Sequence, residues 1–157
     1  MDNNIKKVVS FDDTLIGNKN IIDFDVPGDP FGKQRPRAAR KGRFITIYTP
    51  RETKEYENKV IKYYNKYYKG TKLEGPINVK INGIFGIPKS VSKYKAEKMI
   101  NKEIPHTKKP DCDNLAKSIL DALNNVAYND DAQITKLEIS KEYAIEGKAK
   151  ILIKEEK

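Results

Sequence analysis

The side chains best suited to chemistry lie between residues 111 and 131. Asp111 and Asp113 open a segment of helical periodicity, Lys117 follows one turn later, and Asp130 and Asp131 come just beyond its end. Crowded carboxylates repel one another unless a cation is bound, and oxygen ligands without His or Cys favour Mg²⁺ or Mn²⁺ over Zn²⁺. Such a metal ion polarises a phosphate and activates water, while a lysine offsets developing negative charge. The pattern predicts a metal-dependent hydrolase of nucleic-acid phosphodiesters.

The same residues also have an ordinary structural explanation. An aspartate at a helix N-terminus caps the helix and contributes typically ~1 kcal/mol, and Asn129-Asp130-Asp131 is common turn chemistry. For any single aspartate this explanation is the better one, but for the whole set with a lysine in reach we favour catalysis. The two acidic pairs meet only if the chain turns back, because a straight helix of this length separates its ends by roughly 20 Å.

An amphipathic helix, predicted from about Asn114 to Ala127, would position these groups. Its apolar stripe is expected to pack on a sheet and consists of Leu115, Ile119, Leu123 and Val126. Asp113 is expected at the N-cap, with Lys117 four residues later on the same side. Asp111 follows Pro110 and is expected to be extended toward the same space.

A basic segment, residues 28–43, is expected to supply the surface for a polyanion. It has one acid, Asp29, and six bases: Lys33, Arg35, Arg37, Arg40, Lys41 and Arg43. Such a segment cannot bury itself, so it is predicted to be an exposed loop whose cations contact phosphates. Lys108 and Lys109, just before the first acidic pair, are further candidates for DNA binding. An ordinary solvated loop is the alternative.

The charge distribution supports the same interpretation. The chain has 31 Lys and Arg against 22 Asp and Glu, a net charge of +9, yet residues 111–157 hold ten acids and only seven bases. An acidic cluster in a basic protein fits a cation site that faces a polyanion.

The single Cys112 excludes an internal disulfide and a Cys-rich zinc site. We find no apolar run long enough for a membrane span and no signal peptide, so we expect an intracellular protein.

The remaining pattern predicts one α+β domain over residues 20–157, after a polar N-terminal extension over residues 1–19. A helix capped by Thr49 is expected to run to Tyr68, and a second, highly charged helix is expected over residues 90–100. The first should pack its stripe of Tyr56, Val60, Tyr63 and Tyr67 against a sheet. Strands are expected at Ile21–Val26, Phe44–Tyr48, Ile77–Ile87 with a bulge at Gly83, Ile134–Tyr143 and Lys148–Lys154, the last two paired as a hairpin. His106 is expected in a loop, where we favour no functional role, with a role as a ligand near Asp111 as the alternative.

The acidic motif resembles that of the RusA family of Holliday-junction resolvases. The matching residues, in order and nearly in spacing, are Pro110-Asp111-Cys112-Asp113-Asn114-Leu115, Lys117, Asp121-Ala122-Leu123 and Asp130-Asp131-Ala132-Gln133. Gly32–Arg37 and Pro88–Ser90 resemble upstream blocks of the family, so the similarity extends roughly from Ile22 to Ile153. The long Ser90–Lys109 insertion departs from the shortest members.

The resemblance implies a Mg²⁺-dependent endodeoxyribonuclease, with Mn²⁺ able to substitute, that resolves four-way DNA junctions by paired nicks in recombination and repair. It also implies a cytoplasmic location in a bacterial or phage-infected cell. It implies Asp111, Asp113 and Asp131 as catalytic metal ligands and Lys117 as an essential lysine. Asp130 also matches the motif, but the resemblance leaves its role open. Lys141 falls on a position that is basic in the family. The implied fold is a mixed sheet with helices, assembled as a homodimer whose twofold symmetry suits the junction. A broader nuclease for branched or flap DNA and a non-catalytic basic DNA-binding module are the alternatives.

Overall fold

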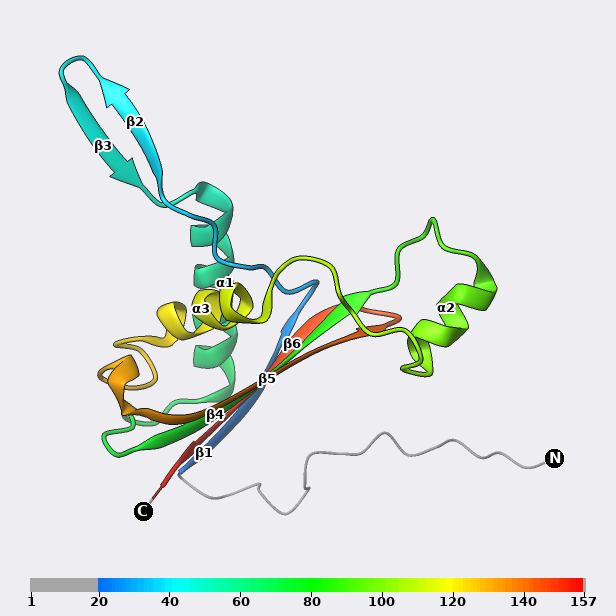
Figure 1. Ribbon diagram of the computed structural model, residues 1–157. Helices are drawn as coiled ribbons and strands as arrows, with labels where there is room; N and C mark the ends of the chain where they lie inside the picture. Colours follow the sequence, from blue (N-terminus) through cyan, green and yellow to red (C-terminus); the bar gives the residue numbers. More distant parts are fainter. Residues whose placement is uncertain (1–19, 157) are drawn as a thin grey trace.

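A four-stranded mixed sheet organises the chain, of which the computed structural model describes residues 20–156. The strand order is β1 (Ile21–Pro27), β6 (Lys148–Glu155), β4 (Ile77–Gly86) and β5 (Ile134–Ala144) (Figure 1). β4 pairs with β5 in parallel, and the other two pairings are antiparallel. The predicted α+β class with a mixed sheet is therefore confirmed, while the predicted extension over residues 1–19 lies outside the described residues.

The predicted hairpin of the last two strands is wrong, because β4 lies between β5 and β6. β4 is the most deeply buried strand. A position inside the sheet covers its apolar side chains, which an edge position would leave more exposed. The link of residues 145–147 only has to cross two strand spacings, roughly 10 Å, which three or four residues can span. Sequence proximity therefore did not decide the pairing.

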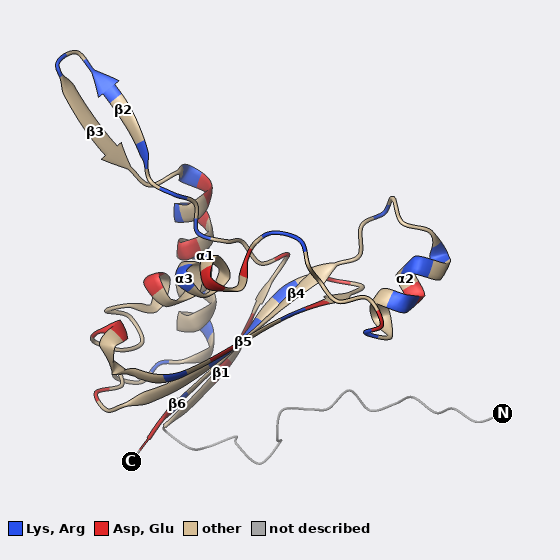
Figure 2. Ribbon diagram, in the orientation of Figure 1, with Lys and Arg blue, Asp and Glu red and all other residues tan. Residues whose placement is uncertain are grey.

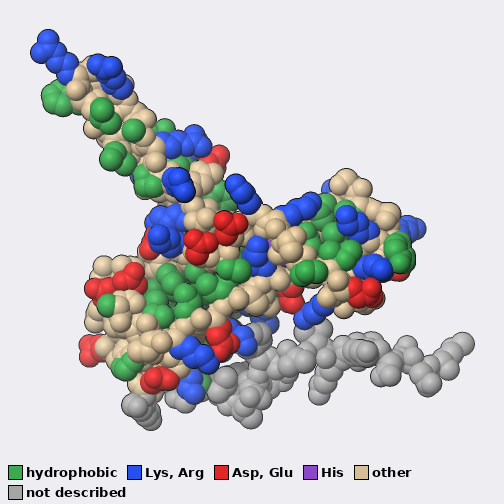
Figure 3. All heavy atoms as spheres, in the orientation of Figure 1, with side chains coloured by type: hydrophobic (Ala, Val, Ile, Leu, Met, Phe, Trp, Pro, Cys, Tyr) green, Lys and Arg blue, Asp and Glu red, His purple; other side chains and the backbone are tan. Residues whose placement is uncertain are grey.

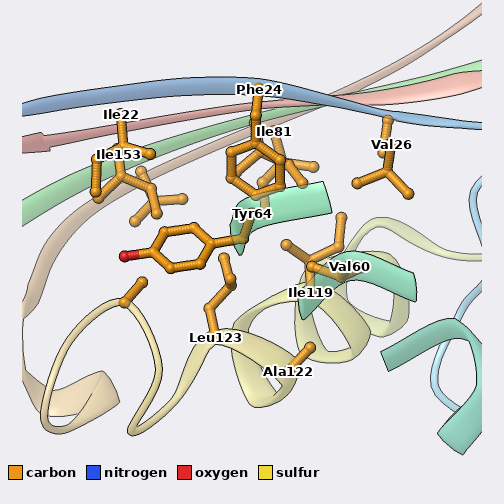
Figure 4. Close-up of a cluster of buried hydrophobic side chains, with 14 of the residues drawn as sticks. Ile22, Phe24, Val26, Val60, Tyr64, Ile81, Ile119, Ala122, Leu123 and Ile153 are labelled. Carbon is orange, nitrogen blue, oxygen red and sulfur yellow. The ribbon is translucent and has the colours of Figure 1, made fainter. Parts of the chain in front are cut away.

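Two helices, α1 (Arg51–Tyr67) and α3 (Cys112–Leu123), cover one face of the sheet (Figure 1). Figure 4 shows their side chains meeting those of the strands, with Phe24 of β1 edge-on to Tyr64 of α1 at 5.7 Å between ring centroids. The side chains with no exposed surface include Val26, Val60, Ile77, Ile81, Leu115, Ile119, Leu123, Ile151 and Ile153. This core fixes the position of α3 relative to the sheet.

The first helix differs from its prediction in two details. It begins at Arg51 with Pro50 at the N-cap, and no side chain caps it, so the expected capping by Thr49 is wrong. The buried stripe is Thr53, Tyr56, Val60 and Tyr64, whereas Tyr67 is exposed. Tyr67 also has helical spacing from Val60, but it is the last residue of the helix and stays exposed.

α3 starts earlier and ends earlier than expected, at Cys112 and Leu123. Asp111, not Asp113, occupies the N-cap position, and its side chain makes no capping hydrogen bond. Gly83 is not a bulge, since the only register shift between β4 and β5 lies at Ile77 and Asn78. A Cβ atom at Gly83 would lie 2.6 Å from Cδ2 of Leu115, so this glycine allows the helix to pack closely on the sheet.

The second helix, α2 (Lys93–Ile100), lies at the far end of β4 and β5 rather than over the sheet (Figure 1). A small cluster of Phe85, Met99 and Tyr143 holds it there. His106 follows in the connection to α3 and is buried, with its ring stacked on Phe85 at 3.9 Å. It is therefore part of this cluster and not a surface loop residue.

The predicted basic loop is partly ordered as a hairpin that projects from the body (Figure 1). β2 (Arg37–Lys41) pairs with β3 (Phe44–Tyr48), and every residue of both strands is exposed. Within the basic segment, residues 28–36 lie outside any helix or strand. The strand at Phe44–Tyr48 is confirmed, and the loop prediction for residues 37–41 is wrong, because the tight turn at Gly42 and Arg43 pairs them with it.

Candidate active site

The exposed face of α3 carries a stripe of charged side chains opposite its buried face. Asp113, Lys117 and Asp121 follow one another at intervals of four residues and are all exposed. Leu115, Ile119 and Leu123 point the other way into the core. The helix therefore presents carboxylates and an ammonium group from one rigid surface, as its amphipathic pattern requires.

The basic segment packs directly against this helix. A Cβ atom at Gly32 would lie 2.4 Å from Cβ of Pro110, so only glycine fits beside the entrance of α3. The amide of Lys33 donates a 2.9 Å hydrogen bond to the carbonyl of Asn114. Ser118, buried on α3, donates to the carbonyl of Phe31 at 2.6 Å. These contacts join the cationic and the acidic segments into one site.

Lys33 is bound to carboxylates rather than extended toward solvent. Its ammonium group forms ion pairs with Asp121 and, at 3.3 Å, with Glu57 of α1. Partial burial lowers the pKa of Lys33, but the hydrogen bonds to both carboxylates outweigh this effect, and the pKa lies above its usual value. Lys33 therefore ties α1, α3 and the basic segment together.

Lys141 is similarly engaged. Its ammonium group donates 2.8 Å hydrogen bonds to the carbonyls of Lys108 and Pro110. Since Asp111 follows Pro110 directly, Lys141 holds the chain at the point where it enters the acidic motif. Its position is suited to orienting this segment.

The second acidic pair lies beside the far half of α3 (Figure 1). Asp131 begins the short 3₁₀ helix Asp131–Gln133, and Asp130 caps it through a capping box with Gln133. A side-chain hydrogen bond with Asp130 raises the pKa of Asp131, and the charges of Asp130 and Asp121 add to the effect. The backbone amide of Ala132 lowers the pKa of Asp130. Asp130 thus has a structural role in the turn.

Within residues 20–156, no three His, Cys, Asp or Glu side chains are close enough together to hold a metal ion. Asp111, Asp113 and Asp131 therefore do not form a metal site as the structure places them. All three are exposed, so ions in the solvent can reach their carboxylates. Their chemistry fits Mg²⁺, since the donors are all carboxylates. The hydrogen bond with Asp130 is the main cause of the raised pKa of Asp131, and a cation bound there would relieve the added repulsion from Asp130 and Asp121.

Basic side chains surround these acids. Figure 2 shows Lys and Arg along the hairpin and in the loop that leads into α3, with Asp and Glu between them. Figure 3 shows the two kinds of charge adjoining at the root of the hairpin. The exposed cations among the predicted DNA-binding residues are Arg35, Arg37, Arg40, Lys41, Arg43, Lys108 and Lys109. The surface can attract a polyanion toward the carboxylates.

The structure adds two acids that sequence reasoning did not assign to the site. Asp121 binds Lys33 and raises the pKa of Asp131, and Glu57 completes the Lys33 ion pairs. The spacing of Asp121, four residues after Lys117 and eight after Asp113, was a signal for it. No local signal distinguishes Glu57 from the other charged residues of α1.

Known proteins resemble this chain over most of its length. The sequence profile of the family described as endodeoxyribonuclease RusA matches residues 27–154. The uncharacterized protein YqaN of Bacillus subtilis (strain 168) is 33% identical over 136 residues, which covers 85% of this chain and 96% of that protein. In addition, no helix in the described part of the chain is long and apolar enough to cross a membrane.

Proposed function

Because the chain belongs to the RusA family of endodeoxyribonucleases, we propose that it hydrolyses DNA phosphodiesters at four-way junctions with Mg²⁺, for which Mn²⁺ can substitute. The observation that carries the proposal is the packing of the basic segment onto α3. The Lys33 amide bonds to Asn114, one residue after Asp113, so phosphate-binding cations adjoin the carboxylates. A nuclease needs both at one place, whereas the binding of DNA by itself requires only the cations.

In this proposal Asp111, Asp113 and Asp131 hold the metal ion. When bound, Mg²⁺ supplies the activation of the attacking water and the polarisation of the scissile phosphate. Asp130 remains in the turn that it caps.

Lys117 stands one turn after Asp113 on the exposed face of α3. It offsets the negative charge that develops on the phosphate in the transition state. The arginines of the hairpin bind the flanking phosphates and bring the strand to the carboxylates. A homodimer places two such sites about a twofold axis, as paired nicks on opposing strands require.

The test compares cleavage of a synthetic four-way junction, a flap and a linear duplex in Mg²⁺. Asp111→Asn and Asp113→Asn should lower junction cleavage by at least 100-fold and leave junction binding intact, because removing negative charge does not weaken attraction to phosphate. Asp23→Asn is the matched control, since Asp23 is an exposed aspartate of β1.

The outcomes separate the candidate functions. If both site variants cut like the wild type, the assignment of the carboxylates is wrong. Equal cleavage of flaps and junctions would make the protein a broader nuclease for branched DNA. A wild-type protein that binds the junction without cutting it would be a binding module.

A further inference from the structure

The projecting hairpin exposes apolar side chains that the proposed chemistry does not use. Phe44, Ile45 and Ile47 of β3 are 78%, 72% and 73% exposed, and Tyr48 is 43% exposed. Figure 3 shows hydrophobic side chains along one edge of this arm and cations at its tip. A soluble monomer rarely gathers exposed apolar groups of this size, so the arm is suited to contact another molecule.

Both faces of the hairpin combine apolar and cationic groups. The register pairs Lys41 with Phe44 and Arg37 with Tyr48 on one face, and Arg40 with Ile45 on the other. Between residues 37 and 48 there are four Lys and Arg and no acid. The partner must therefore accept positive charge and apolar side chains over the same short distance.

Branched DNA fits these requirements better than a second copy of this chain. The chain carries a net charge of +9, so a second copy offers no general attraction to an arm of charge +4. Phosphates do, and a two-stranded ribbon has the size that a DNA groove admits. Apolar side chains inserted between base steps unstack them, and this is easiest where pairing is already disturbed, as at a branch point.

We propose that the hairpin is a wedge for branched DNA, a use that rests on the proposed function. The apolar side chains of β3, with Phe44 next to the turn, enter the branch point and unstack its bases, while Arg37, Arg40, Lys41 and Arg43 bind the surrounding phosphates. The hairpin starts three residues after Gln34, whose backbone N–H donates a hydrogen bond to Oγ1 of Thr53 in α1. This contact fixes the root of the hairpin beside the carboxylates. The wedge thereby sets which phosphate reaches them.

The experiment measures fluorescence of 2-aminopurine placed at the branch point of a four-way junction, in EDTA so that no strand is cut. Binding of the wild-type chain should raise the fluorescence, because unstacking relieves quenching. Phe44→Ser and Ile45→Ser should each remove most of the rise and weaken junction binding by about tenfold, with affinity for linear duplex changed less than twofold. Ile145→Ser is the matched control, since Ile145 is 80% exposed between β5 and β6.

Several results would overturn the wedge: a fluorescence rise unaffected by Phe44→Ser, an equal effect of Ile145→Ser, or no rise with the wild-type chain. A shift of the variants to a smaller oligomer in sedimentation, with unchanged fluorescence, would assign the arm to contact between copies and overturn the wedge too. Cleavage in Mg²⁺ keeps the two proposals apart. If the wild-type chain does not cut but shows a fluorescence rise that depends on Phe44, the nuclease proposal is refuted and the wedge is supported. If the chain cuts and the rise does not depend on Phe44, the nuclease proposal is supported and the wedge is refuted.

Discussion

Replacing Gly83 by alanine tests how closely α3 must approach the sheet. The new Cβ atom would lie 2.6 Å from Cδ2 of Leu115 and 3.2 Å from Cε2 of Phe85, well inside the distance of about 3.5–4.0 Å at which carbon atoms attract one another. Leu115 has no exposed surface, so it has little freedom to turn away. An overpacked core loses about 1–3 kcal/mol, and for a chain of this length that corresponds to a melting temperature lower by roughly 2–12 °C.

Thermal unfolding followed by circular dichroism measures the loss, and a double-mutant cycle identifies its cause. Leu115→Ala alone should lower the free energy of unfolding by about 2–5 kcal/mol. The double variant with Gly83→Ala should lose less than the sum of the two single losses, because the shorter side chain at position 115 makes room for the new Cβ atom. Leu123→Ala is the control, since it is buried on the same helix but is not among the atoms nearest Gly83. Gly83→Ala should also slow junction cleavage where the variant is folded, because α3 carries Asp113 and Lys117. The close approach of α3 would be refuted if Gly83→Ala melted at the wild-type temperature. It would also be refuted if the stability losses of Gly83→Ala and Leu115→Ala simply added in the double variant.

Three further variants test the other contacts. Lys33→Met should lower stability by roughly 1 kcal/mol in denaturant unfolding at pH 7, because it leaves Asp121 and Glu57 unpaired. The folded-state pKa of Lys33 is raised above 10.5, so the stability difference between Lys33→Met and the wild type should be lost only as the pH rises through that folded-state value. A stability difference that stays unchanged at higher pH would contradict the ion pairs. Lys141→Met should lower the rate constant of junction cleavage about tenfold and leave the salt dependence of junction binding unchanged. A smaller salt slope would instead make Lys141 a phosphate contact. Burial and the charge of Lys141 lower the pKa of His106 below 6.5, so the wild-type chain should lose stability as the pH falls from 6.5 toward that lower value, because the unfolded chain takes up the proton first. His106→Phe should show a smaller loss over the same range, and an equal loss would refute this account.

Local patterns were reliable where burial alone sets them. β1, β4 and β6 follow their alternation of apolar residues, and the stripe of Leu115, Ile119 and Leu123 is buried as predicted. Helix ends were less predictable, because the cap depends on backbone angles that several neighbouring residues can adopt. Asp111 and Asp113 illustrate this, since either can start the helix and the structure selects the first.

The candidate site was predictable in its residue types but not in its contacts. The roles of the acids and of Lys117 were inferred from spacing and from the resemblance and stay predictions, whereas the family was confirmed. The partners of Lys33 and Lys141 were not foreseen, because no local signal separates a lysine that binds phosphate from one that binds carboxylates or backbone carbonyls of its own chain. The gathering of all the carboxylates around one metal stays a prediction.

The sequence by itself determined which segments are amphipathic, where the charges fall and which motif the chain carries, because these depend on neighbours along the chain. Only the tertiary structure decided that β4 separates β5 from β6 and that the basic segment partly forms an exposed hairpin. It also decided that Lys33 binds Asp121, 88 positions away. The physical reason is that strand neighbours and ion pairs are selected by burial and distance in space, which residues remote in the sequence decide together.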